Sequence, residues 1–368
     1  MALGWSGSNG GITQNYKSIS AKNLRQDYAQ QMCSYPLEVS YFVNNICNLK
    51  CRHCYVGYKN ENNSLTVEQW EQVFDECIAI GALTFGNVGK EPTLSWEKSV
   101  ALLQYLKEKR RQKSKIRFGL VTNAILLNKE KSKELSEINP DYLDISLDGT
   151  KEINDTIRGH GSYAKVINNI KLFPRDLLNN VFISFTANQL NLRAIPELID
   201  EIYKIGVKNI LISPYVSNHI AGNIKEDDLY VKEDNIVIEI EKLLNGELIN
   251  FDRYDDLNIY VKTDFTSFSS LMQKFVDKKI IDRNNLKIDE YGVIFTKYTF
   301  NSNNIYFNYL PWDNSFTQAI RISHDGFIGN CYDMLFRDYS DKAIGNVKNN
   351  SVIQILKSTR SKIERKNK

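Results

Sequence analysis

The sequence lacks any run of about 18 consecutive apolar residues, the length needed to cross a bilayer. Its first residues also lack a basic start followed by an apolar segment, which argues against a secretion signal. The net charge is only +3, so the chain has no basic excess of the kind that nucleic-acid-binding proteins carry. From these absences we expect no membrane partner and no nucleic-acid partner.

Cysteine is scarce and irregularly spaced. The six cysteines do not form the even framework of a disulfide-rich secreted domain, which indicates a reducing compartment. Neither the 19 glycines nor the 7 prolines are in excess, and there is no repeat or low-complexity tract. A chain of 368 residues with this ordinary composition can bury a substantial core. The sequence therefore predicts a globular protein with a cytoplasmic location.

Strand-like and helix-like segments alternate from residue 36 onward. β-Branched and aromatic runs of strand length occupy residues 38–45, 82–88, 115–123, 142–148, 180–188 and 207–216. Apolar residues at helical spacing lie between them, over residues 65–81, 99–113, 128–137, 162–173 and 195–205. Six strands alternating with helices predict parallel β–α units, arranged as an open doubly wound sheet or as a partial barrel.

The alternation ends at residue 216. The next stretch predicts helices at 231–245 and 266–278 and strands at 257–263 and 291–299, an α+β segment. Residues 319–336 predict a hairpin with Asp325–Gly326 at its turn, and residues 345–358 lead into a terminal helix. We therefore predict four segments: an N-terminal extension (1–36), the main α/β domain (37–216), an α+β linker or substrate region (217–318) and a C-terminal element (319–368).

Three cysteines form the motif CNLKCRHCY at residues 47–55. Three thiolates on a loop just after a strand can hold three corners of an iron–sulfur cubane. A structural zinc site requires four ligands, and the nearest fourth candidate, His53, lies inside the loop. A cluster with three protein ligands leaves one iron open to a chelating molecule. Cys47, Cys51 and Cys54 are thus candidate metal ligands, and a non-catalytic metal-binding protein is the alternative.

This C-x3-C-x2-C motif, followed by an aromatic residue, resembles that of the radical S-adenosylmethionine (SAM) superfamily. The resemblance implies a partial (β/α)6 TIM-like barrel of parallel strands with a C-terminal α+β extension. It implies two cofactors, one [4Fe–4S] cluster and SAM, with SAM at the C-terminal ends of the strands. Reductive cleavage of SAM would give a 5′-deoxyadenosyl radical that abstracts a substrate hydrogen. The implied electron donor is of flavodoxin or ferredoxin type.

Four further motifs extend the resemblance over residues 38–216: VGKEPTL (88–94), VTNA (121–124), SLDG (146–149) and IRGHGSY (157–163). The first is similar to the family's Gly-Gly-Glu-Pro motif, with Lys90 in place of the second glycine. It implies that Glu91 accepts a hydrogen bond from the SAM amino group. The SAM-binding residues implied by the resemblance are Tyr55, Gly89, Glu91, Asn123, Ser146 and Arg158, with Ser184 and Ile212 as weaker candidates for adenosine contacts.

Residues 323–331 and 343–356 resemble the start of a SPASM or twitch extension, which commonly binds auxiliary clusters. Cys331 is the only cysteine after position 77, so this extension looks degenerate. Cys331 is either a buried small hydrophobe or a catalytic donor of a hydrogen atom to a substrate radical. We therefore expect a radical SAM enzyme, an epimerase/isomerase or a maturase, acting on a peptide or small natural product. Carbon–carbon or thioether cross-linking and dehydrogenation are the alternatives to epimerisation.

Overall fold

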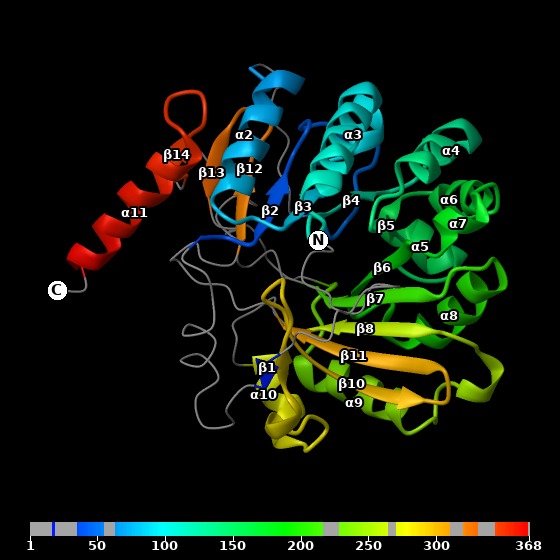
Figure 1. Cartoon of the computed structure of the whole chain (residues 1–368). Helices are drawn as coiled ribbons and strands as arrows, with labels where there is room; N and C mark the ends of the chain where they lie inside the picture. The colour runs from blue at the N-terminus through cyan, green and yellow to red at the C-terminus, as the bar shows by residue number, and fades with distance from the viewer. Residues whose placement is uncertain are drawn as a thin grey trace.

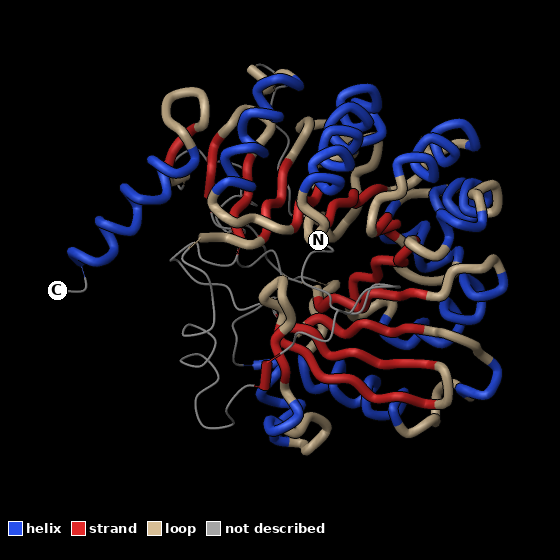
Figure 2. The backbone as a smooth tube through the Cα atoms, in the orientation of Figure 1, coloured by secondary structure: helices blue, strands red, loops and turns tan. Residues whose placement is uncertain are grey.

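A computed structural model describes residues 17–18, 35–54, 63–215, 228–263, 270–309, 319–329 and 343–366. Within these residues, fourteen strands join one sheet in the order β1-β9-β10-β11-β8-β7-β6-β5-β4-β3-β2-β12-β13-β14. The sheet is curled (Figure 2). The six predicted strands pair in parallel in chain order. They are β2 (Glu38–Tyr41), β3 (Thr84–Asn87), β4 (Arg117–Thr122), β5 (Tyr142–Ser146), β6 (Val181–Ala187) and β7 (Asn209–Pro214).

The helices between these strands cover the convex side of the sheet (Figure 1). The predicted ones are α2 (Val67–Ala79), α3 (Trp96–Gln112), α4 (Lys129–Ile138), α6 (Ser162–Ile170) and α8 (Ile195–Lys204). Helix α2 begins with a capping box, in which Thr66 and Gln69 each accept a hydrogen bond from the other's backbone N–H. Its buried face includes Cys77, which is fully buried and packs in the core.

The parallel sheet continues beyond the six predicted strands. Strand β8 (Asn258–Lys262) adds in parallel to β7, and β11 (Asn303–Tyr309) adds in parallel to β8. On the opposite side, β12 (Ala319–Ile322) pairs in parallel with β2. The predicted fold class, a partial barrel of parallel strands with an α+β extension, is confirmed. The division into four segments stays a prediction, although all four contribute strands to this sheet.

The remaining elements flank the barrel. The antiparallel strands are β1 (Lys17–Ser18), β9 (Lys287–Ile288), β10 (Ile294–Phe300), β13 (Phe327–Gly329) and β14 (Gly345–Asn346). The other helices are α5 (Lys151–Arg158), α7 (Arg175–Leu178), α9 (Glu233–Leu244), α10 (Ser270–Asp277) and α11 (Val352–Lys366), with 3-10 turns η1 (Pro92–Ser95), η2 (Leu192–Ala194), η4 (Phe251–Arg253) and η5 (Arg283–Asn285). The hairpin predicted at Asp325–Gly326 is confirmed, since β12 and β13 pair antiparallel around it. No helix in the described ranges is long and apolar enough to span a bilayer.

The two faces of the sheet bury different side chains. The large core lies between the convex face and the helices, where aromatic rings such as Phe74 and Phe85 meet at 5.3 Å. A second cluster contains one side chain from each of five neighbouring strands: Tyr142, Phe182, Leu211, Tyr260 and Tyr306. Since it is separate from the helix-packed core, we assign this second cluster to the concave face. Because side chains alternate along a strand, residues two positions further along each strand also face the concave side.

Candidate active site at the strand ends

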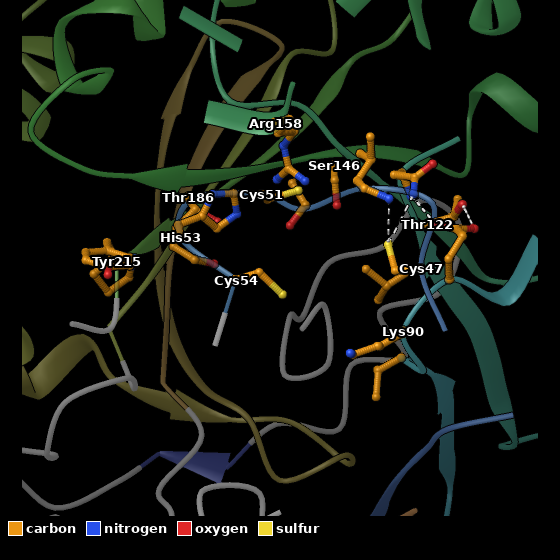
Figure 3. Close-up of a pocket in the computed structure, with 18 residues that line it drawn as sticks. Cys47, Cys51, His53, Cys54, Lys90, Thr122, Ser146, Arg158, Thr186 and Tyr215 are labelled. Atoms are coloured by element: carbon orange, nitrogen blue, oxygen red, sulfur yellow. Dashed lines mark hydrogen bonds between the residues drawn. The ribbon is translucent and has the colours of Figure 1, made fainter. Parts of the chain in front are cut away.

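A single pocket gathers residues from the C-terminal ends of β3 to β7 and from the loop after β2 (Figure 3). We call it the strand-end pocket. Its lining residues are Cys47, Leu49, Cys51, His53, Cys54, Val88, Lys90, Glu91, Val121, Thr122, Asn123, Ser146, Arg158, Ser184, Thr186, Ser213, Pro214 and Tyr215. Parallel strands end at the same edge of a barrel, so residues far apart in sequence meet there. The structure thus brings the three motif cysteines together with four predicted SAM-binding residues.

The cysteine loop presents all three thiols to this pocket. Cys47 and Cys51 are half-buried, and Cys54 is exposed. The sulfur of Cys47 accepts hydrogen bonds from the Leu49 backbone N–H at 3.4 Å and from the Asn123 amide at 3.8 Å. Burial raises the pKa of the Cys51 thiol to about 11, and the nearby Arg158 guanidinium opposes this rise.

This donor set suits a cubane better than a single metal ion. Among the residues that the structure describes, no three Cys, His, Asp or Glu side chains converge as the ligands of one ion would. Three thiols placed around one pocket, with N–H donors aimed at a sulfur, match the ligands and the sulfur-directed hydrogen bonds of a [4Fe–4S] cluster. The residues present therefore fit the cluster that the motif implies.

The carboxylate of Glu91 is fixed by four donors although its side chain is only 1% exposed. Its Oε1 accepts from the Thr93 backbone N–H at 3.0 Å, from the Thr93 hydroxyl at 2.5 Å and from the Thr122 hydroxyl at 2.6 Å. Its Oε2 accepts from the Asn123 backbone N–H at 2.8 Å. Burial raises the pKa of Glu91, and these hydrogen bonds counter the rise. Since a carboxylate oxygen has two lone pairs, Oε2 keeps acceptor capacity for a ligand.

The turn that carries Glu91 is tied to the cysteine loop. The Glu91 backbone N–H donates to the Ile46 carbonyl at 3.0 Å, and the Asn44 amide donates to the Glu91 carbonyl at 2.8 Å. From the neighbouring strand end, the Asn123 amide donates to Asn48 Oδ1 at 2.7 Å. Three separate segments are therefore held in one geometry around the pocket.

Gly89 allows this turn to approach the two residues that follow β2 closely. A Cβ atom at this position would lie 2.5 Å from the Phe42 Cα and 2.8 Å from the Val43 nitrogen. Such distances are far below van der Waals contact, so only glycine fits here. Gly89 does not line the strand-end pocket. The close backbone approach that Gly89 permits is therefore between its own turn and residues Phe42 and Val43.

Arg158 lies in a buried ion pair beside the cysteine loop. Asp148 is fully buried, and its Oδ1 accepts from the Thr186 backbone N–H at 2.8 Å. The Nε of Arg158 is 2.7 Å from the other carboxylate oxygen, Oδ2. His53 Nε2 lies 3.6 Å from the same oxygen, and burial lowers the pKa of His53 to about 4. The neutral imidazole therefore lies against Asp148. A backbone hydrogen bond from Arg52 to Ile157, at 2.9 Å, joins the loop to the end of α5.

Two predicted site residues, Tyr55 and Cys331, lie outside the described residues. Of the weaker candidates, Ser184 lines the pocket, whereas Ile212 does not and its neighbour Ser213 does. Sequence reasoning missed several pocket residues: Thr122, Thr186, Ser213 and Tyr215 in the lining and Asp148 behind Arg158. The available signal was position, since each is a polar or aromatic residue at the C-terminal end of a predicted strand.

A half-barrel whose strand ends carry a three-thiol loop defines a class of cofactor-dependent α/β enzymes, and comparison with known proteins specifies the family. The model of the radical SAM superfamily matches residues 41–185. The chain is 27% identical over 222 residues to Fe-coproporphyrin III synthase of Methanosarcina barkeri, covering 57% of this chain and 54% of that protein. It is 25% identical over 167 residues to PqqA peptide cyclase of Bradyrhizobium diazoefficiens, covering 45% and 42%.

The crystal structure of Streptococcus suis SuiB bound to precursor peptide SuiA superposes with a TM-score of 0.64 at 17% identity. This match covers 92% of this chain and 70% of that chain, and it shows the shared fold. Residues 41–185 thus match the radical SAM superfamily, whose members use a [4Fe–4S] cluster and SAM. It spans about half the length of the curated relatives described above.

Proposed function

We propose that this protein is a radical SAM enzyme that modifies a peptide. The observation that carries the proposal is the strand-end pocket itself, where three thiols and the fixed Glu91 carboxylate face one space. Two relatives support a peptide substrate by their names, a PqqA peptide cyclase and SuiB in complex with a precursor peptide.

Two different sets of residues would hold the two cofactors. Cys47, Cys51 and Cys54 would ligate three irons, and the N–H donors at Cys47 stabilise its thiolate form. Oε2 of Glu91 would accept from the SAM ammonium, Ser146 would contact the SAM carboxylate or ribose, and Arg158 would help to position SAM; all three residues line the pocket. When bound, cluster and SAM supply a 5′-deoxyadenosyl radical that takes a hydrogen atom from the substrate, after one electron from a flavodoxin- or ferredoxin-type donor.

For the finer outcome we propose epimerisation, with Cys331 as the catalytic thiol that returns a hydrogen atom to the substrate radical. The proposal rests on Cys331 being the single cysteine after position 77, in a segment (319–368) that resembles a SPASM or twitch extension. One thiol cannot hold an auxiliary cluster of the usual kind. Cross-linking and dehydrogenation are the alternative outcomes.

The test is anaerobic reconstitution followed by metal analysis and SAM turnover. The wild type should hold about four irons and four sulfides, and should convert SAM to 5′-deoxyadenosine and methionine when reduced with dithionite. Changing Cys47, Cys51 and Cys54 together to Ala should abolish both properties. Cys77→Ala, which removes a buried core thiol, should retain both. Iron retained by the triple variant would refute the ligand assignment, and about eight irons would refute a single cluster.

A further inference from the structure

A row of polar side chains crosses four adjacent strands on the concave face of the sheet. It starts with Thr186 on β6, which pairs with Ser213 on β7. Continuation of the β7–β8 ladder brings Ser213 beside Lys262, and Lys262 pairs with Asn308 on β11. We call Thr186, Ser213, Lys262 and Asn308 the polar row. Since Thr186 and Ser213 also line the strand-end pocket, the row begins in that pocket and leads away from it.

On the concave face, the polar row is adjacent to an apolar cluster, which we call the apolar floor. Ser213, Lys262 and Asn308 each lie two positions after a member of the concave-face cluster. Those members are Leu211, Tyr260 and Tyr306. The rings of Tyr260 and Tyr306 stack with centroids 4.7 Å apart and an interplanar angle of 6°. Because side chains alternate along a strand, the row faces the same side as this floor, one step nearer the strand ends.

Two members of the row carry buried polar atoms without a protein partner. The Asn308 side chain is fully buried, yet within the described part of the chain neither its Nδ2 nor its Oδ1 makes a hydrogen bond. The Ser213 hydroxyl, 8% exposed, is in the same situation there. The Asn308 backbone is satisfied, since its carbonyl accepts from the Thr263 N–H and hydroxyl at 3.0 Å each. Natural proteins rarely leave such groups unpaired, so each requires an explanation.

We propose that the polar row is a substrate subsite that hydrogen-bonds the main-chain amide of a peptide. The primary amide of Asn308 offers one donor and one acceptor side by side, which can pair with a peptide amide in two hydrogen bonds. The Ser213 hydroxyl adds a donor or acceptor next to the pocket, and the buried, stacked rings of Tyr260 and Tyr306 make the surroundings of the row apolar. This inference rests on the proposed function, because it places a peptide beside the bound SAM.

The first test separates a ligand-binding amide from a structural one by thermal unfolding. Asn308→Leu replaces an unpartnered amide by an apolar group of similar size, so the Tm should stay the same or rise. Asn303 is the matched control: it lies on the same strand and is fully buried, but its Nδ2 donates to the Phe251 and Tyr254 carbonyls at 3.0 Å each. Asn303→Leu should lower the Tm. A comparable loss in Asn308→Leu would overturn the proposal.

The second test measures binding by equilibrium dialysis of cluster-loaded protein with SAM and no reductant. The probes are a pool of acetylated, amidated tripeptides and a matched pool in which esters replace the amides. The wild type should retain tripeptides and not the esters, and Asn308→Leu should bind them about tenfold more weakly, the effect of one or two lost hydrogen bonds. Equal binding by variant and wild type, equal binding of esters, or no tripeptide binding by the wild type would each overturn the subsite.

These outcomes are distinguishable from a failure of the proposed function. Absence of dithionite-driven SAM cleavage in the wild type would refute the proposed enzyme. The dialysis requires neither reductant nor cleavage, so its result tests the subsite independently.

Discussion

Changing Glu91 to Gln tests the proposed contact between this side chain and SAM. In the wild type every donor near the carboxylate points at an oxygen: Thr93 and Thr122 supply three at Oε1, and Asn123 supplies one at Oε2. Glutamine replaces one of the two oxygens by an NH2 group. The threonine hydroxyls can rotate to accept from it, but a backbone N–H cannot. Whichever way the amide turns, it faces the backbone N–H of Thr93 or of Asn123.

Two effects follow from this substitution, one on stability and one on SAM binding. One backbone N–H loses its acceptor in a buried place, which should lower the free energy of unfolding by about 1–3 kcal/mol. The SAM ammonium also loses a charge-assisted hydrogen bond, worth about 1.5–3 kcal/mol. Since 1.4 kcal/mol corresponds to tenfold in a dissociation constant, the affinity for SAM should fall at least about tenfold. The cluster should be unaffected, because Glu91 provides no ligand to it.

The assay is calorimetric titration of the anaerobic, unreduced protein with SAM, together with the visible absorption of the cluster. Glu97→Gln is the matched control, because Glu97 is exposed in the first turn of α3, six residues further along. That variant should bind SAM as the wild type does. An unchanged SAM affinity in Glu91→Gln would show that this turn does not contact SAM, and a lost cluster spectrum would show that its role is to support the cysteine loop.

Two further predictions concern Asp144 and Cys331. Asp144 is fully buried and, within the described residues, neither carboxylate oxygen has a hydrogen-bond partner; burial raises its pKa from 3.8 to about 7. The folded state therefore binds the proton more tightly, so the wild type should lose stability relative to Asp144→Asn as pH rises from about 4 to 7, by up to about 4 kcal/mol. Parallel urea-unfolding results for the two proteins at pH 5 and pH 8 would refute this. Cys331→Ala and Cys331→Ser should still cleave SAM but fail to complete an epimerisation, and in heavy water the wild-type product should gain one deuterium. Full product formation by the Ala variant would reduce Cys331 to a packing residue.

The six barrel strands and their helices were predictable because their patterns are local. Other elements were not predicted, among them α5 (Lys151–Arg158) and β11 (Asn303–Tyr309). Helix α5 has only Ile153 and Ile157 as apolar residues, too few for a helical pattern. Strand β11 is rich in asparagine, which disfavours strands. It forms because β8 and β10 pair with it on both sides, contacts that a local pattern does not contain.

The residues of the site likewise divide into those that the sequence predicted and those that it did not. The cysteines, Glu91, Asn123, Ser146 and Arg158 were predicted from short motifs, and the structure gathers them at one pocket. The partners that hold them were not predicted, because they depend on which loops meet in space. The ion pair between Arg158 and Asp148 joins residues ten positions apart across a helix. The polar row combines single side chains from four strands, none of which belongs to a motif.

The position of β12 beside β2 sets the order in which the barrel can be completed during synthesis. Chains emerge from the ribosome N-terminus first, at about 5–20 residues per second. Strand β2 leads into the cysteine loop, but its neighbour on one side, Ala319–Ile322, is among the last parts of the described chain to be made. Until then the edge of β2 that pairs with β12 has no partner strand. A ribosome-bound chain stalled before residue 319 therefore lacks β12, the strand that pairs with β2 on that side.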